Sequence, residues 1–314
     1  MLITFTVVIF GALGIAFLSL VMRMIQYDGR VLPAVAVGLV ILVGAVIAVV
    51  AAKFRASARS RWERWYRLDS FASANGMVFS PRGSAPQYPG AIFSAGHSRQ
   101  SLDHLRSTSG RFLDYGNYRY VTGSGKNKST HNWGFLALQL DRSLPHMVLD
   151  SRANNGLFGV SNLPAAFRKE QVLSLEGDFN NHFTLYCPQA YERDALYVFT
   201  PDLMALLIDN AAPFDVEIVD KWMFVYSAKP FVMLKPAVHQ RLLSIVDTVG
   251  AKTLTQTDRY SDERVQNFTA NLVAPHGQRL KRRVPIVSIA IGILVAVGFF
   301  VFPLVTALLA VEGL

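Results

Sequence analysis

Three long segments without a charged side chain constrain this chain more than any other feature. They comprise residues 1–22, 31–52 and 284–311. About 20 apolar residues in a helix cross the hydrocarbon core of a bilayer, and core helices of soluble proteins rarely carry so long an uncharged run. The sequence therefore predicts three transmembrane helices. The first has no basic N-terminal region and a longer apolar run than signal peptides have, so we expect it to be retained.

The charges beside these segments predict their orientation. Basic residues follow the second segment and precede the third, whereas the link between the first two holds only Arg23 and Arg30 against Asp28. Short cytoplasmic flanks carry such an excess of Lys and Arg. We therefore expect a multi-pass protein of the bacterial inner (cytoplasmic) membrane, with its N-terminus and residues 54–283 cytoplasmic and its C-terminus external.

The same flanks supply the candidate membrane interface. Residues 54–76 predict a basic helix in which two tryptophans and a tyrosine share one face, at headgroup level beside anionic lipid or packed on the soluble domain. Residues 261–283 predict a basic linker to the third span. The candidate interface residues are Arg55, Arg59, Arg61, Trp62, Arg64, Trp65, Tyr66, Arg67, Arg279, Lys281, Arg282 and Arg283.

The net charge of +9 is explained by these flanks. Residues 53–67 and 279–283 hold ten of the 31 basic residues and one of the 22 acidic residues, so the rest of the chain carries 21 of each. A nucleic-acid-binding protein concentrates its basic surplus on the folded domain. The charge distribution therefore argues against nucleic acid and for the lipid bilayer as partner. The single cysteine excludes a disulfide framework within the chain and fits a reducing cytoplasm.

Residues 77–260 predict a cytoplasmic α+β domain with a mainly antiparallel sheet and a few helices, inserted between transmembrane helices. Residues 80–110 are rich in Gly, Pro and Ser and predict an irregular segment with one helical turn near Leu102. Asp220-Lys221 predicts a tight hairpin turn. Strands are expected at 112–121, 132–140, 146–151, 182–187, 195–199, 215–219 and 222–227, and helices at 200–209 and 236–250.

Sequence motifs for catalysis are not assembled in this chain. The segment GSGK (residues 123–126) resembles a phosphate-binding loop, but Tyr120 stands where that motif needs glycine, Asn127 where it needs Ser or Thr, and a strand is expected next. The seven histidines show no zinc-binding spacing, and no GxSxG sequence occurs. We therefore predict no catalytic, cofactor-binding or metal-ligating residues and no cofactor, and whether the protein is an enzyme stays open.

The stretch around the only cysteine suggests a nucleophile with its base: His182, Cys187, Glu192 and Asp194 lie within 13 residues. Side chains alternate along a strand, however. Cys187 then shares a face with Phe183 and Leu185, whereas His182 points the other way. We therefore predict that Cys187 is a buried core residue, inert as most buried thiols are.

The segments 133–152 and 174–227 resemble a family of uncharacterised actinobacterial integral membrane proteins. The pattern consists of an aliphatic strand, Arg, Leu-Pro, a second strand and Asp-Ser-Arg, and the likeness covers about residues 115–230. The flanking spans agree with that family's layout. The resemblance implies a bacterial inner-membrane protein with a cytoplasmic domain, and it transfers no catalytic residues.

The leading functional hypothesis is a membrane-anchored module whose cytoplasmic domain binds a protein or ligand beside the bilayer. The first alternative is a membrane-tethered hydrolase of lipid-linked or peptide substrates, with catalytic groups brought together from distant loops. The second is an accessory subunit of a larger membrane complex. Ser288, Gly292 and Ala296 form a small-residue stripe in the third segment that would permit helix packing, including homo-oligomers.

Overall fold

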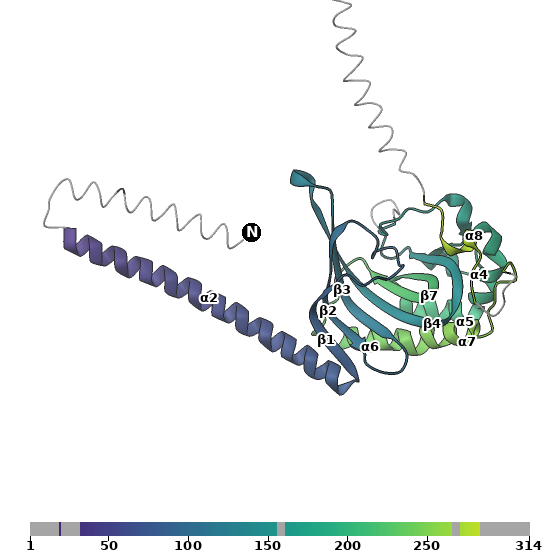
Figure 1. Cartoon of the computed structure of the whole chain (residues 1–314), viewed down its shortest axis with the longest axis horizontal. Coiled ribbons are helices and arrows are strands. Elements are labelled where there is room, and N and C mark those ends of the chain that lie inside the picture. The colour runs from purple at the N-terminus through teal and green to yellow at the C-terminus, as the bar shows by residue number, and fades with distance from the viewer. Residues whose placement is uncertain (1–18, 20–31, 156–160, 266–270, 283–314) are drawn as a thin grey trace, which may run out of the picture. The chain divides into compact units, whose positions relative to one another are not determined.

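The computed structural model describes residues 19, 32–155, 161–265 and 271–282 (Figure 1). The chain divides into two compact units, Met1–Arg64 and Trp65–Leu314. The predicted spans at 1–22 and 284–311, and Arg283, lie outside the described residues apart from Ser19. Each unit is treated by itself below.

Helix α2 (Leu32–Ala74) joins the second predicted span and the predicted basic helix into one element. Residues 45–74 contain neither glycine nor proline, so nothing in the sequence interrupts the helix. The helix ends just before Gly76, whose φ of 65° is the left-handed conformation typical of helix C-termini. The helix therefore ends within two residues of the boundary predicted at residue 76.

In the described part of the chain, seven strands form one antiparallel sheet, which confirms the predicted α+β class. The order is β1-β2-β3-β4-β6-β5, and β7 pairs with β4. Within the described residues, the strands are β1 (Met77–Ser84), β2 (His97–Ser107), β3 (Leu113–Thr122), β4 (Ser129–Ser151), β5 (Val172–Leu173), β6 (Phe183–Tyr186) and β7 (Asp215–Ser227).

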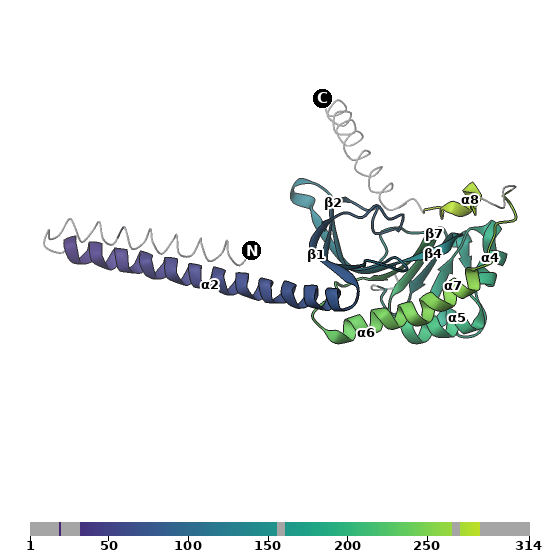
Figure 2. The same ribbon diagram turned by 60° about the horizontal axis from the view of Figure 1, so that its bottom comes forward.

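Helices cover one face of this sheet (Figure 2). Their apolar side chains join one core cluster with Val216, Ile218, Met223 and Val225 of β7 and with Leu68 from the end of α2. The helices of this face are α3 (Phe179–His182), α4 (Glu192–Val198), α5 (Pro201–Leu206), α6 (Pro236–Ile245) and α7 (Ala251–Thr257), with π-helical turns at Leu207–Ala211 and Val246–Gly250. The short helix α8 (Pro275–Gln278) contributes no side chain to this cluster.

The opposite face is covered by loops rather than helices. Phe135 of β4 and Phe224 of β7 form a second, aromatic-rich core cluster with Phe93, Phe167 and Leu280, which come from three connecting segments. Side chains on neighbouring positions of β7 therefore enter different clusters. The polar networks described below lie on this loop-covered face.

The predicted hairpin turn at Asp220-Lys221 is wrong, because β7 continues through it. Asp220 has a φ of 54°, and four β4 residues between Gln139 and Leu144 lie opposite one β7 residue. Such a bulge changes which residues face each side. Even-numbered residues of β7 face the helices before Asp220, and odd-numbered residues face them after it.

Three other sequence-based assignments are wrong in whole or in part. Residues 80–110 are irregular only at 85–96 and 108–110, because β1 and β2 pair over most of their length and Leu102 lies in a strand. Residues 195–199 belong largely to helix α4, not to a strand. Residues 146–151 continue β4 instead of forming a separate strand. For residues 146–151 the pairing partners, β6 and β7, are distant in sequence, so local composition did not indicate the continuous strand.

Candidate functional site

The first basic cluster of the candidate interface lies entirely on α2. Arg55, Arg59, Arg61 and Arg67 are exposed, and Arg64 is half-buried. The side chain of Arg59 forms a 3.0 Å ion pair with Glu63, one turn away.

The three aromatic residues of α2 do not share one environment. Trp62 is 68% exposed and Tyr66 is 74% exposed. Trp65 is partly buried and packs against the core cluster of the helix-covered face. Of the two arrangements considered from the sequence, Trp65 therefore follows the one in which the aromatic ring packs on the domain.

The second basic cluster is held against the sheet domain. Arg279 forms a two-pronged ion pair with Asp220, in which both nitrogen–oxygen distances are 2.9 Å. The backbone N–H of Lys281 donates to the side chain of Gln171 at 2.8 Å, and that side chain donates back to the Lys281 carbonyl at 2.8 Å. The backbone of Arg282 forms an isolated antiparallel β-bridge with that of Phe167. The segment expected to be a linker is thus docked over residues 271–282.

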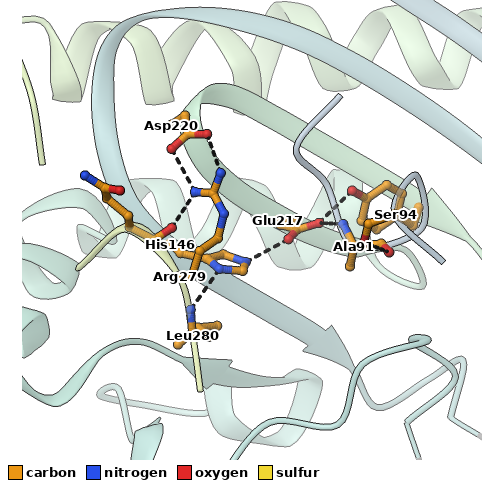
Figure 3. A network of polar contacts seen from close by, with 9 residues as sticks. Ala91, Ser94, His146, Glu217, Asp220, Arg279 and Leu280 are labelled. Atoms are coloured by element: carbon orange, nitrogen blue, oxygen red, sulfur yellow. Dashed lines mark hydrogen bonds and ion pairs between the residues drawn. The ribbon is translucent and has the colours of Figure 1, made fainter. Parts of the chain in front are cut away.

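A buried carboxylate, Glu217 of β7, organises the docking of this segment (Figure 3). One of its oxygens accepts a 2.7 Å hydrogen bond from Nε2 of His146. The other accepts from the hydroxyl of Tyr226 at 2.6 Å and from the backbone N–H of Ala91 at 2.7 Å. Three donors replace the water that this carboxylate loses on burial. Burial, and then Glu217 itself, raises the pKa of Tyr226 well above its ordinary value.

The tautomer of His146 follows from its two partners. The backbone N–H of Leu280 donates to Nδ1 at 3.0 Å, so Nδ1 is the acceptor. Nε2 therefore carries the hydrogen and donates the hydrogen bond to Glu217. His146 therefore links Glu217 to the C-terminal segment. The ion pair between Arg279 and Asp220 lies beside this link (Figure 3).

A second buried carboxylate, Asp114 of β3, has a closely similar set of partners. Its oxygens accept hydrogen bonds from Nδ1 of His104 at 3.0 Å, from the hydroxyl of Tyr88 at 2.7 Å and from the guanidinium of Arg106 at 2.9 Å. Burial raises the pKa of Asp114, but hydrogen bonds from His104, Tyr88 and Arg106 outweigh it, so the pKa lies below its ordinary value. Burial beside Asp114 in turn raises the pKa of Tyr88.

The two carboxylates together fix one connecting segment over the aromatic face. The hydroxyl of Tyr88 donates a hydrogen bond to Asp114, and the backbone N–H of Ala91 donates one to Glu217. The segment between β1 and β2 is therefore attached at two points three residues apart. Phe93 of the same segment packs edge-on against Phe135 at a ring-centroid distance of 5.3 Å. The polar contacts therefore position the segment, and the aromatic contacts fill the space beneath it.

One histidine nitrogen in these networks has no partner. Nε2 of His104 is buried and makes no hydrogen bond, while Nδ1 faces Asp114. A Cβ on Gly83 would lie 2.6 Å from the hydroxyl oxygen of Ser101 and 2.7 Å from this nitrogen. Ser101, His104 and Asp114 thus have the residue types of a Ser–His–Asp triad, but the Ser101 hydroxyl donates to the carbonyl of Ser84 at 3.2 Å. The backbone of Gly83 lies against the serine and the histidine, and Ser101 is 1% exposed.

A pair of acidic residues occupies the end of the same sheet face. Asp150 of β4 lies opposite Asp215 of β7, one position beyond the Leu149–Val216 pair. Burial, and then the nearby Asp150, raises the pKa of Asp215 to about 7, although Ser151 and Asn154 donate hydrogen bonds to it. Its Oδ2 atom is buried without a partner.

Cys187 follows β6 and is 1% exposed within the core cluster of the helix-covered face. Burial, followed by the charges of Glu192 and Asp194, raises its pKa to about 12. The thiol is therefore protonated near neutral pH and has no nucleophilic character. The predicted core position of Cys187 is confirmed, although His182 lies in the short helix α3 and not on the strand.

The expectation for the GSGK segment agrees with the geometry. Residues 125–127 form a short turn between the paired strands β3 and β4, as expected for a hairpin and not for a phosphate-binding loop. Within the described residues, no group of three or more His, Cys, Asp or Glu side chains is arranged to hold a metal ion.

Sequence reasoning missed Asp114, Glu217, His104 and His146. One local signal could have found the acids: Glu217 stands inside the apolar run DVEIV, and Asp114 follows Phe112 and Leu113 and precedes Tyr115. A carboxylate among such neighbours is buried only when donors satisfy it. The donors come from residues up to 126 positions away and have no sequence signature.

Comparisons with known proteins provide no family for this chain. No family model matches it, and no curated protein matches it. Among solved structures, it is similar to the crystal structure of the mycobacterial trehalose monomycolate transport factor A, TtfA, with 11% sequence identity and a TM-score of 0.38. The match covers 62% of this chain and 91% of that chain.

Proposed function

We propose that this chain is a multi-pass inner-membrane protein that presents its α+β domain on the cytoplasmic side to bind a protein or ligand. One observation carries the membrane assignment. Among the described residues, one helix, Ile41–Ala74, is long and apolar enough to cross a bilayer, with a mean hydropathy of 1.9 over its best window. None of that window is buried. An apolar helix surface that the described residues leave uncovered is stable in lipid and costly in water.

The spacing of basic residues along α2 supports contact with anionic headgroups. A rise of about 1.5 Å per residue places Arg55 roughly 5 Å and Arg61 roughly 14 Å beyond Ala52, the last residue of the apolar run. The headgroup layer is about 5–8 Å thick on each side. In an upright helix, Lys53 and Arg55 therefore reach the headgroups, and Arg61 lies beyond them.

The polar networks argue against a catalytic role for their carboxylates and for His146. The polar side-chain atoms of Glu217, His146 and Asp114 form hydrogen bonds with other residues of the same domain. Groups engaged in this way hold segments in place and have no position open to a substrate. The resemblance to actinobacterial membrane proteins and the possibility of an accessory subunit or homo-oligomer fit the same proposal.

A hydrolase is the second candidate, and one observation favours it: His104 is oriented by Asp114 and keeps a nitrogen without a partner near Ser101. The closeness of Gly83 opposes it, since a substrate carbonyl needs the space between nucleophile and base. Labelling of the full chain by a fluorophosphonate, abolished by Ser101→Ala and retained in Ser107→Ala, would establish the hydrolase. Absence of labelling in the folded wild-type chain would exclude a reactive Ser101.

The membrane assignment is tested on the full chain in bacterial membranes. We expect the protein to stay in the pellet after alkaline carbonate extraction. We also expect green fluorescent protein inserted at the 125–127 turn to fluoresce, and alkaline phosphatase fused to the C-terminus to be active. Active phosphatase at the 125–127 turn would reverse the orientation, and release by carbonate would remove the transmembrane anchor from the proposal.

The headgroup contact has a matched test. Lys53→Gln with Arg55→Gln is expected to reduce recovery of anionic lipid with the purified protein more than Arg61→Gln with Arg64→Gln. Equal losses would show that the position along α2 does not matter.

A further inference from the structure

An apolar cleft of about 290 Å³ lies between the C-terminal end of α2, the segment before α6, and α6 itself. Leu68 and Phe71 line it from α2, Met233 and Leu234 from the segment, and Leu243 from α6. All of these residues belong to the sheet-containing unit. Other clefts on this unit, such as the one around Arg193 and Arg264, are lined mainly by polar and charged side chains.

The polar atoms of His239, which also lines the cleft, are already engaged. Its Nε2 donates to the carbonyl of Met233 at 2.6 Å, and its Nδ1 accepts from the hydroxyl of Tyr115 at 3.0 Å. Its ring packs on Phe71 at a centroid distance of 4.3 Å. An occupant therefore meets hydrocarbon and ring surfaces here and gains no hydrogen bond from the histidine. Recognition inside the cleft rests on apolar contact.

The cleft has a positive charge at its rim, and no acidic side chain is among the residues that line it. Arg67 is the one formally charged side chain among the lining residues, and it is exposed. The adjoining segment is flanked by Lys229 and Lys235, and between them Val232 is 55% exposed and Leu234 is 43% exposed. A ligand that is apolar along its length and anionic at one end matches both the walls and the rim.

We propose that this cleft binds one acyl chain of an anionic amphiphile, with the acidic group at Arg67. The proposal rests on the membrane-bound binding role above, because a bilayer-anchored domain meets such molecules continually. A narrow chain fits the volume. A partner's amphipathic helix, about 10–12 Å in diameter, requires a wider groove than a cleft of about 290 Å³ provides.

The test uses the purified full chain in amphipol and a photoreactive palmitate, with the labelled peptide identified by mass spectrometry. We expect labelling in residues 65–75 and 231–243, and competition by unlabelled palmitate. Laurate, four carbons shorter, should compete at least about tenfold more weakly, because each buried methylene contributes to binding. Hexadecanol, which lacks the charge, should also compete more weakly than palmitate.

Variants separate the cleft from general hydrophobicity. Leu243→Trp fills the cleft and should abolish labelling there, whereas Leu196→Trp, at an exposed leucine of α4, should not. Arg67→Gln should remove the preference for palmitate over hexadecanol, and Arg193→Gln should leave it unchanged.

Labelling of the cleft peptides that persists in Leu243→Trp, or equal competition by laurate and palmitate, would overturn the proposal. So would benzoylphenylalanine at position 243 capturing a protein or a second copy of the chain in cells. Release from membranes by carbonate would contradict the proposed membrane function and leave labelling of the cleft intact, so the two failures are distinguishable.

Discussion

Nε2 of His146 lies 2.7 Å from a carboxylate oxygen of Glu217, while the opposite ring nitrogen accepts the backbone N–H of Leu280. One ring thus joins the centre of the sheet to the segment that precedes the third predicted span. Replacing it leaves a buried carboxylate with one donor fewer and a buried N–H without an acceptor.

We predict that His146→Phe lowers the free energy of unfolding by about 2–4 kcal/mol, the usual cost of two unsatisfied buried groups. Thermal unfolding of the full chain in detergent measures the effect. His97→Phe, at an exposed histidine of β2, is the control and should change stability by less than about 1 kcal/mol. Equal effects of the two variants would contradict the central role of His146.

The pKa of Asp215, raised to about 7, predicts a pH dependence of stability. Between about pH 4 and 7 the folded protein keeps a proton on this carboxyl that the unfolded chain has lost. Stability contributed by the protonated group therefore decreases as pH rises through this window, by up to about 4 kcal/mol. The raised pKa of Asp150 acts in the same direction.

Asp215→Asn should make the unfolding temperature less dependent on pH between 5 and 8, because the amide does not titrate. The asparagine oxygen can still accept from Ser151 and Asn154. Asp178→Asn, at an exposed aspartate, should keep the wild-type slope. A slope unchanged by Asp215→Asn would mean that this carboxyl does not titrate in the window.

The sequence was sufficient for features that depend on local pattern. Residues 45–74 form one helix because no glycine or proline interrupts them. Cys187 is buried because it lies on the same face as Phe183 and Leu185 of β6. Features that depend on distant partners were not predictable. The strand through Asp220 continues because β4 accommodates the bulge and Arg279 binds the carboxylate, and neither partner is near in sequence.

We predict that Cys187 is unreactive in the folded protein, since burial raises its pKa to about 12. Modification by a maleimide should be slow under native conditions and rapid after denaturation. Cys187→Ala should cost about 1–2 kcal/mol of stability through the lost sulfur contacts. Rapid native modification would place the thiol at the surface.

Asp220 combines a left-handed backbone with an ion pair, and the two contributions can be separated. Arg279→Ala should cost about 0.5–1 kcal/mol, because both side chains of this pair are partly exposed. Asp220→Ala should cost about 1–2 kcal/mol more, since alanine is strained at a φ of 54°. Asp220→Gly removes the ion pair but tolerates this φ, so it should resemble Arg279→Ala. A glycine variant as unstable as the alanine variant would show that backbone strain is not the cause.

Gly83 provides the sharpest test of packing around His104. A Cβ at this position meets the Ser101 hydroxyl oxygen at 2.6 Å and Nε2 of His104 at 2.7 Å, distances that require one of these groups to move. Gly83→Ala should therefore destabilise the domain by about 1–3 kcal/mol. Adding Ser101→Ala removes one of the two contacts, so the double variant should be more stable than the sum of the single effects predicts, by at least about 0.5 kcal/mol.

Gly110→Ala would not serve as a control because of its positive φ, but Gly38→Ala, with no atom near its Cβ, does. Strict additivity of the Gly83 and Ser101 variants would mean that β1 shifts away from β2, and that the space between Ser101 and His104 opens more readily than their burial indicates.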